Sequence, residues 1–101
     1  MLTGKQKRWL RARAHNLEPI VQVGKHGLVD TLIVALDQAL TARELVKVRV
    51  LNNCLEPMDE IAHGLSEGTG SELVQKIGHN LVFYRPNPEN PILELPGTDR
   101  L

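Results

Sequence analysis

The segment from residue 20 to residue 50 constrains the fold most, because two β-branched runs flank one helical pattern. Ile20–Val23 is a short β-branched run, typical of a buried strand. From Leu28 to about Ala42, apolar residues recur every three or four positions, which predicts a helix. Apolar and basic residues alternate in Leu45–Val50, which predicts a second strand with its valines inward and Lys47 and Arg49 outward. Strand, helix and strand form a βαβ unit, so the two strands are expected to be parallel.

Residues 3–15 are predicted to form a first helix with one basic face. Thr3 and Gln6 fit a capping box at its start. One arc of the helix is largely apolar, and Trp9 and Leu10 are expected to be buried there, with Arg13 at the edge of that arc. The opposite arc is expected to present four basic side chains to solvent: Lys5, Lys7, Arg8 and Arg11.

The second half of the sequence predicts a third helix and a β-hairpin. Residues 56–67 are predicted to form the helix, with Pro57 at its first position and Gly68 or Gly70 as its stop. Residues 72–77 and 80–85 form two strands joined by a type II′ turn at Gly78 and His79. That turn predicts two cross-strand pairs, Val74 with Phe83 and Glu72 with Arg85.

From Pro86 onward, four prolines in eleven positions predict an extended tail, with residues 92–95 docking as an edge segment. The chain has 101 residues, enough for one core. We therefore expect a single domain over residues 1–86 and a proline-rich tail over residues 87–101. The predicted order α-β-α-β-α-β-β gives a compact α/β (α+β) fold with a mixed four-stranded sheet.

The formal charge of the whole chain is zero, which taken alone argues against a nucleic-acid binder. The distribution changes that conclusion. Residues 1–50 hold nine basic and four acidic side chains, a charge of +5, and residues 51–101 hold three basic and eight acidic ones, a charge of −5. Such asymmetry indicates a basic binding face.

Several kinds of chemistry find no support in the sequence. The four histidines and Cys54 have no spacing typical of metal ligands, so no metal is expected. Cys54 is either a small buried hydrophobic residue or a nucleophile beside a distant histidine. No catalytic or dinucleotide-binding motif is present, so we expect no enzyme activity, cofactor or small-molecule substrate. No apolar run is long enough to span a membrane, and a cytoplasmic protein is the default expectation.

The loop Gly24-Lys25-His26-Gly27 carries the functional hypothesis. It lies between the first strand and the longest predicted helix, where unpaired N–H groups and the helix dipole favour an anion. Its glycines allow the backbone to approach a phosphate, and Lys25 and His26 add polar side chains. A GxxG loop clamps the nucleic-acid backbone in KH domains, although the same pattern also occurs in simple tight turns.

The sequence resembles the CRM (chloroplast RNA splicing and ribosome maturation) domain family, in particular its small stand-alone bacterial YhbY-like members. The resemblance spans about residues 1–86, and it rests on residues 2–7, Leu10-Arg11, Ala14-His15, 23–28, 44–48 and 81–86. It implies a fold similar to the C-terminal domain of translation initiation factor 3 and a role in binding RNA, for the bacterial members rRNA in precursors of the large ribosomal subunit. It also implies that the GxxG loop faces the RNA, flanked by the basic residues of the first helix. The acidic, proline-rich tail departs from the family pattern, which puts in doubt any RNA contact beyond Arg85.

Two functions follow as hypotheses. The first is an rRNA-binding assembly factor without catalytic activity. Its expected RNA contacts are Gly24, Lys25, His26, Gly27, Lys5, Lys7, Arg8, Arg11, Lys47, Arg49 and Arg85. The alternative is a protein-interaction module that docks an acidic partner through the basic half of the chain, or a groove-binding partner through its proline-rich tail.

Overall fold

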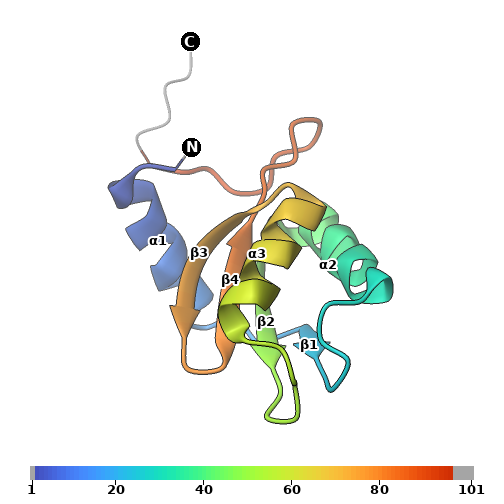
Figure 1. Cartoon of the computed structure of the whole chain (residues 1–101). Coiled ribbons are helices and arrows are strands. Elements are labelled where there is room, and N and C mark those ends of the chain that lie inside the picture. Colours follow the sequence, from blue (N-terminus) through green and yellow to red (C-terminus); the bar gives the residue numbers. More distant parts are fainter. Residues whose placement is uncertain (1, 97–101) are drawn as a thin grey trace.

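A computed structural model describes residues 2–96 of the chain, and residues 97–101 of the predicted tail lie outside this range. The described residues form three helices and four strands in the predicted order (Figure 1). These elements are α1 (Gly4–Ala14), β1 (Val21–Val23), α2 (Asp30–Arg43), β2 (Leu45–Val50), α3 (Met58–Thr69), β3 (Glu72–Ile77) and β4 (Asn80–Tyr84). None of these helices is long and apolar enough to cross a membrane.

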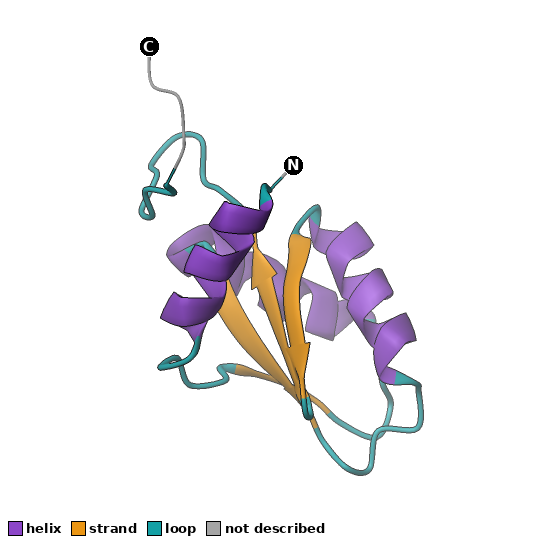
Figure 2. Ribbon diagram, turned by 90° about the vertical axis from the view of Figure 1, so that its left-hand side faces the viewer, coloured by secondary structure: helices purple, strands orange, loops and turns teal. Residues whose placement is uncertain are grey.

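The four strands form one mixed sheet in the order β1-β2-β4-β3. β1 and β2 are parallel, with Gln22 opposite Arg49, which confirms the predicted βαβ unit. α2 and α3 cover one face of the sheet and α1 lies on the other, so the sheet is the middle layer (Figure 2). The buried valines of β2 pack with α2 and α3, and this larger cluster forms the main core.

The smaller core lies between α1 and the other face of the sheet. The predicted capping box is confirmed: the Gln6 N–H donates to Thr3 Oγ1 at 3.1 Å, and the Thr3 N–H donates to Gln6 Oε1 at 3.0 Å. Leu10 is fully buried, as expected. Trp9 is not, because it lies at the rim of this cluster with the Arg13 guanidinium 4.8 Å from its ring centroid.

The β3–β4 hairpin has the predicted turn but a different register. Gly78 has a φ of 57° and His79 has no positive φ, which fits a type II′ turn. A bulge at Val74 then shifts the pairs, so that Leu73 lies opposite Phe83 and Glu72 lies opposite Tyr84. The two predicted cross-strand pairs are therefore wrong. The bulge turns Val74 toward α1, where it is buried.

The described part of the tail docks onto the domain, but it forms no strand. Leu93 and Leu95 pack against the smaller core beside α1. The carboxylate of Glu44 holds the tail against the domain. Glu44 is 1% exposed and has a φ of 65°. This carboxylate accepts backbone N–H groups from Asn87 at 2.6 Å, from Ile92 at 3.0 Å and from Leu93 at 2.7 Å. Glu44 therefore acts as the anchor of the tail.

The same carboxylate affects Tyr84, whose pKa is raised by burial and, to a smaller extent, by the charge of Glu44. A raised pKa in the folded state means that the neutral phenol stabilises the fold. This contribution is fully present below a pH of about 10 and is lost as the pH rises through the pKa of the folded protein. Because the chain has one tyrosine, its ultraviolet absorbance titration reports Tyr84 alone. We expect an apparent pKa above that of the unfolded chain and a smaller increase in Glu44→Gln.

Candidate nucleic-acid interface

The GxxG loop connects the carboxyl end of β1 to α2 as a tight turn. The Gly27 N–H donates to the Gly24 carbonyl at 3.1 Å, which places Lys25 and His26 at the exposed tip. Among residues 2–96, the backbone N–H groups of Lys25 and His26 have no hydrogen-bond partner. Two consecutive unpaired N–H groups beside a lysine ammonium form an environment that favours an anion.

The start of α2 is less open to an anion than the sequence indicates. The carboxylate of Glu56 reaches it from the β2–α3 loop and accepts the Leu28 N–H at 2.7 Å. Asp30 adds a second carboxylate in the first helical turn. The sequence predicts unpaired N–H groups at the start of this helix, but the Leu28 N–H, at the predicted start, is paired with Glu56. The unpaired N–H groups at the loop tip are better placed to face a ligand.

Glu56 is a residue that the sequence reasoning missed. Because β1 and β2 are parallel neighbours, the loops that follow them lie at the same edge of the sheet, where the Leu51 N–H donates to the Val23 carbonyl at 2.9 Å. The predicted βαβ unit therefore contained a signal that residues 51–57 would meet the GxxG loop. Gly27 is buried beside the Glu56 side chain with a φ of 65°.

A groove of about 380 Å³ runs from the loop along the edge strand β1 and the first half of α2. Ile20 and Val29 in its walls are 46% and 41% exposed, which is high for large apolar side chains. Of the residues that line it, His26 alone carries a ring. The groove therefore offers aliphatic contact surface beside the tip of the loop rather than a stack of aromatic platforms.

The two basic residues of β2 lie on the sheet face that carries α1. Arg49 is exposed and pairs in register with Gln22, two residues before the loop. Lys47 is half-buried on the same face, since the alternate residues Val46 and Val48 point into the main core. Arg49 therefore lies near the loop, whereas Lys47 lies beside Ile20, before the start of β1.

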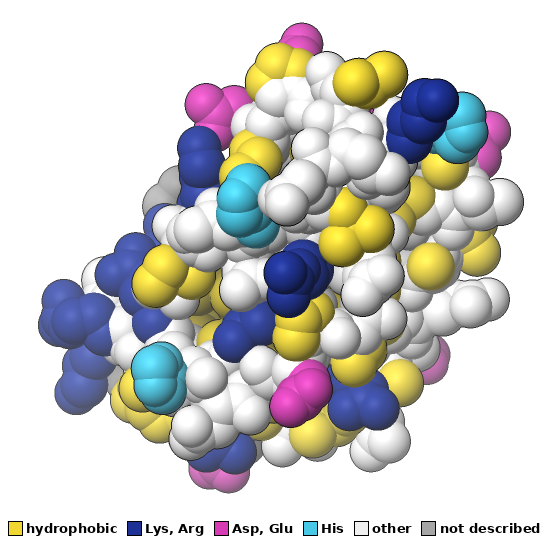
Figure 3. Space-filling model, turned by 90° about the horizontal axis from the view of Figure 1, so that it is seen from below, with side chains coloured by type: hydrophobic (Ala, Val, Ile, Leu, Met, Phe, Trp, Pro, Cys, Tyr) yellow, Lys and Arg dark blue, Asp and Glu magenta, His cyan; other side chains and the backbone are white. Residues whose placement is uncertain are grey.

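The predicted basic residues of α1 are largely open to solvent. Lys5 and Arg8 are exposed and Lys7 is half-buried, while the exposed Arg11 also donates its Nε–H to the Val74 carbonyl at 3.3 Å. Seen from below, basic side chains gather over α1 and continue across the middle of this face, with few acidic ones among them (Figure 3). Of the predicted stripe, Lys7 and Arg11 lie against β3, at the sheet edge opposite to β1, while Lys47 and Arg49 lie on the same sheet face as α1.

Arg85 is the predicted contact that the structure separates from the others. Its guanidinium donates to the Asp37 carboxylate at 2.6 Å, the Thr69 carbonyl at 2.7 Å and Thr41 Oγ1 at 2.8 Å. These bonds join the end of β4 to α2 and α3, and they lie beyond the middle of α2, away from the loop. Arg85 as an RNA contact remains a prediction, and the observed role of its side chain is structural.

The described residues show no cluster of three or more histidine, cysteine, aspartate or glutamate side chains that would hold a metal ion. Cys54 is half-buried and packs against the main core, where its Sγ lies 3.6 Å from the Glu56 carbonyl. This placement agrees with the first of the two readings of Cys54, a small hydrophobic residue.

Comparison with known proteins connects this arrangement to a family. The CRS1/YhbY (CRM) domain profile matches residues 2–85. The chain is 53% identical over 96 residues to the probable RNA-binding protein YqeI of Bacillus subtilis, which covers 95% of this chain and all of the relative. It is 39% identical over 91 residues to an RNA-binding protein of Haemophilus influenzae, covering 90% of this chain and 92% of the relative.

The fold agrees with this relationship. The solution structure of the protein SAV1595 of Staphylococcus aureus superimposes with a TM-score of 0.79 at 53% sequence identity, covering 95% of this chain and 100% of that one. The family match spans all seven helices and strands and ends at Arg85, where the docked tail begins. The chain therefore belongs to the CRS1/YhbY (CRM) domain family, as its resemblance to the YhbY-like proteins indicated.

Proposed function

We propose that this protein binds RNA without catalysing a reaction, with the GxxG loop holding the sugar-phosphate backbone. The observation that carries the proposal is the exposed loop tip, where Lys25 and His26 present two unpaired backbone N–H groups together with the lysine side chain. Two relatives of similar length are named RNA-binding proteins, which supports the same function. The aliphatic groove beside the loop would receive riboses or unpaired bases, and the residues of β2 and α1 would contact further phosphates.

The RNA that we propose is rRNA within precursors of the large ribosomal subunit, in the cytoplasm of a bacterial cell. The support is the YhbY-like character of the chain, together with a surface suited to backbone and shape recognition. Crosslinking to cellular RNA followed by sequencing tests it, with large-subunit rRNA as the expected enriched RNA. Enrichment of messenger RNA or transfer RNA instead would contradict the proposed target but not RNA binding itself.

Co-sedimentation with ribosomal particles separates RNA binding from protein docking. If the protein is held by RNA, ribonuclease treatment should release it from the particles. A protein that stays attached to a ribosomal protein after complete digestion of the RNA would contradict the proposal. The full-length chain is used in both arms.

Lys25 gives a quantitative test of the phosphate contact. We expect Lys25→Ala to weaken binding to large-subunit rRNA fragments regardless of their sequence, and to reduce the slope of log K against log salt by about 1. Fluorescence anisotropy over a series of salt concentrations measures both quantities. Arg43→Ala is the control, because Arg43 lies at the other end of α2 from the loop and outside the proposed RNA contacts. Equal salt slopes for the two variants would exclude Lys25 as a phosphate ligand.

A further inference from the structure

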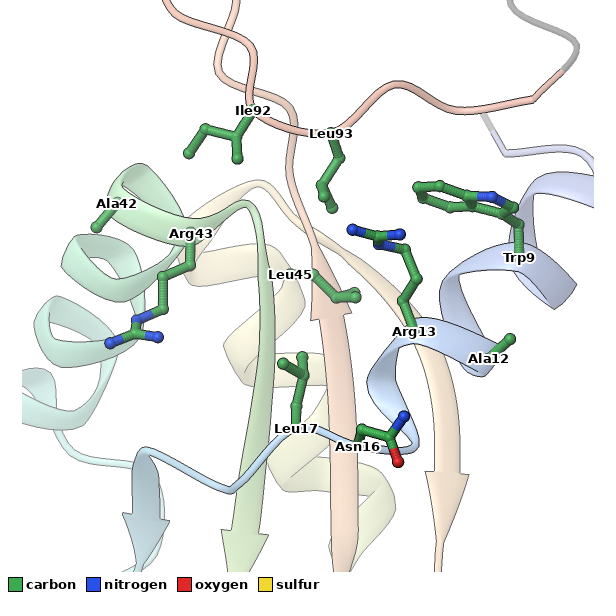
Figure 4. Close-up of a pocket in the computed structure, with 10 residues that line it drawn as sticks. All are labelled: Trp9, Ala12, Arg13, Asn16, Leu17, Ala42, Arg43, Leu45, Ile92 and Leu93. Atoms are coloured by element: carbon green, nitrogen blue, oxygen red, sulfur yellow. The ribbon is translucent and has the colours of Figure 1, made fainter.

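A second groove, of about 620 Å³, lies at the other end of α2 from the GxxG loop. Figure 4 shows Trp9, Ala12 and Arg13 of α1 on one side and Ala42 and Arg43 of α2 on the other. Leu45 of β2 lies between them, and Ile92 and Leu93 of the tail lie above. The docked tail is therefore part of the wall of this groove.

Most of the wall is apolar, and part of it is open to solvent. Leu17 is 36% exposed and Ile92 is 52% exposed, although both border a concave surface. A volume of several hundred cubic ångströms lies within the range of sites that bind drug-sized ligands. The groove is thus large enough for several side chains of a binding partner.

The charge of the groove is entirely positive. Arg13 and Arg43 line it and no acidic residue does. Among residues 2–96, neither guanidinium forms an ion pair. Arg13 is also held in place by its stacking on Trp9. Two unpaired guanidinium groups beside an aliphatic wall are complementary to carboxylates placed next to apolar side chains.

We propose that this groove binds a protein segment that carries acidic and apolar side chains. A nucleic-acid base fits the groove less well, because Arg13 already covers a face of the Trp9 ring. Apart from the indole N–H, Asn16 is the one uncharged polar side chain in the lining that could read a base edge. The site lies at the opposite end of α2 from the loop, so this protein could hold RNA and a protein partner together.

Selection from a library of short random peptides, displayed on phage and panned against the full chain, tests the proposal. We expect the enriched peptides to combine acidic with large apolar residues. Synthetic copies should change the fluorescence of Trp9, which reports on this groove because the chain has one tryptophan. Selection that yields no binders, or binders without acidic residues, would overturn the proposal.

Charge reversal locates the binding. Arg13→Glu and Arg43→Glu are each expected to weaken the selected peptides about tenfold or more, and Ala12→Glu should do the same by adding a carboxylate to the wall. Arg8→Glu is the matched control, an exposed residue of the same helix that does not line the groove. An equal loss of peptide affinity in Arg8→Glu would show a general charge effect. If oligoribonucleotides change the fluorescence of Trp9, and this change depends on Arg13 and Arg43, the groove binds RNA. Either result contradicts a protein-binding groove. Circular dichroism establishes that each variant is folded.

Discussion

Replacement of Glu44 by alanine is expected to lower the free energy of unfolding by about 3 kcal/mol and to release the tail from the domain. The Glu44 carboxylate is buried and accepts three backbone N–H groups of the tail, from Asn87, Ile92 and Leu93. A hydrogen bond to a charged group contributes about 1.5–3 kcal/mol. Water can replace part of this loss once the tail detaches, so the total is expected to be smaller than three full bonds.

Urea unfolding and limited proteolysis measure the two effects separately. In Glu44→Ala, we expect a lower midpoint of unfolding and rapid cleavage within residues 86–96. Glu44→Gln isolates the charge, because its amide keeps the size and one carbonyl acceptor, and an intermediate loss is expected. Glu89→Ala is the control, since Glu89 is an exposed acid of the same tail and its side chain makes no hydrogen bond within the described residues. A tail that stays protected in Glu44→Ala would show that packing of Leu93 and Leu95 alone holds it.

The tail also connects this prediction to the second groove. Ile92 and Leu93 form part of the groove wall, and Glu44 holds both of their backbone N–H groups. Loss of the carboxylate should therefore weaken peptides that bind between Trp9 and Arg43, although residue 44 does not line the groove. RNA binding at the GxxG loop, at the far end of α2, should be retained at temperatures where the variant is folded.

Local patterns in the sequence predicted most of the fold. The capping box of Thr3 and Gln6 and the alternation in β2 depend on residues close together in the chain, and both are confirmed. The observed register of the hairpin differs from the predicted one, because the prediction counts pairs outward from the turn at Gly78 and assumes no bulge. The bulge at Val74 forms because that side chain is buried against α1, and a contact between elements distant in sequence has no local signal.

The candidate site shows the same division. The GxxG motif and the basic residues of α1 and β2 could be found from residue type and spacing. The role of Glu44 could not, because its carboxylate binds backbone N–H groups more than forty residues away, and for Glu56 the parallel strands indicated only that its loop would lie near the GxxG loop. In the sequence both count only as acidic charge, and in the structure both fix a segment that borders a groove.

The two glycines of the loop are expected to respond in opposite ways to alanine. Gly27 has a φ of 65°, and a Cβ on it would collide with Glu56 Oε1. Gly27→Ala is therefore expected to lower the free energy of unfolding by about 2–4 kcal/mol through backbone strain and loss of the Glu56 contact with Leu28. Glu56→Ala alone should lose only the contact with Leu28, so the additional loss in the double variant Gly27→Ala with Glu56→Ala measures the part caused by φ.

Gly24 has no positive φ, and a Cβ on it would meet no atom within 4 Å. Gly24→Ala should therefore leave the stability unchanged or raise it by about 0.4–1 kcal/mol. Its RNA affinity should nevertheless fall by about tenfold, because a methyl group at the mouth of the loop would keep a phosphate away from the unpaired N–H groups of Lys25 and His26. Thermal unfolding and rRNA-fragment anisotropy on the same preparations separate the two glycines. Full RNA affinity in stable Gly24→Ala would mean that no backbone phosphate approaches the loop at this position, and Gly24 would then serve the turn alone.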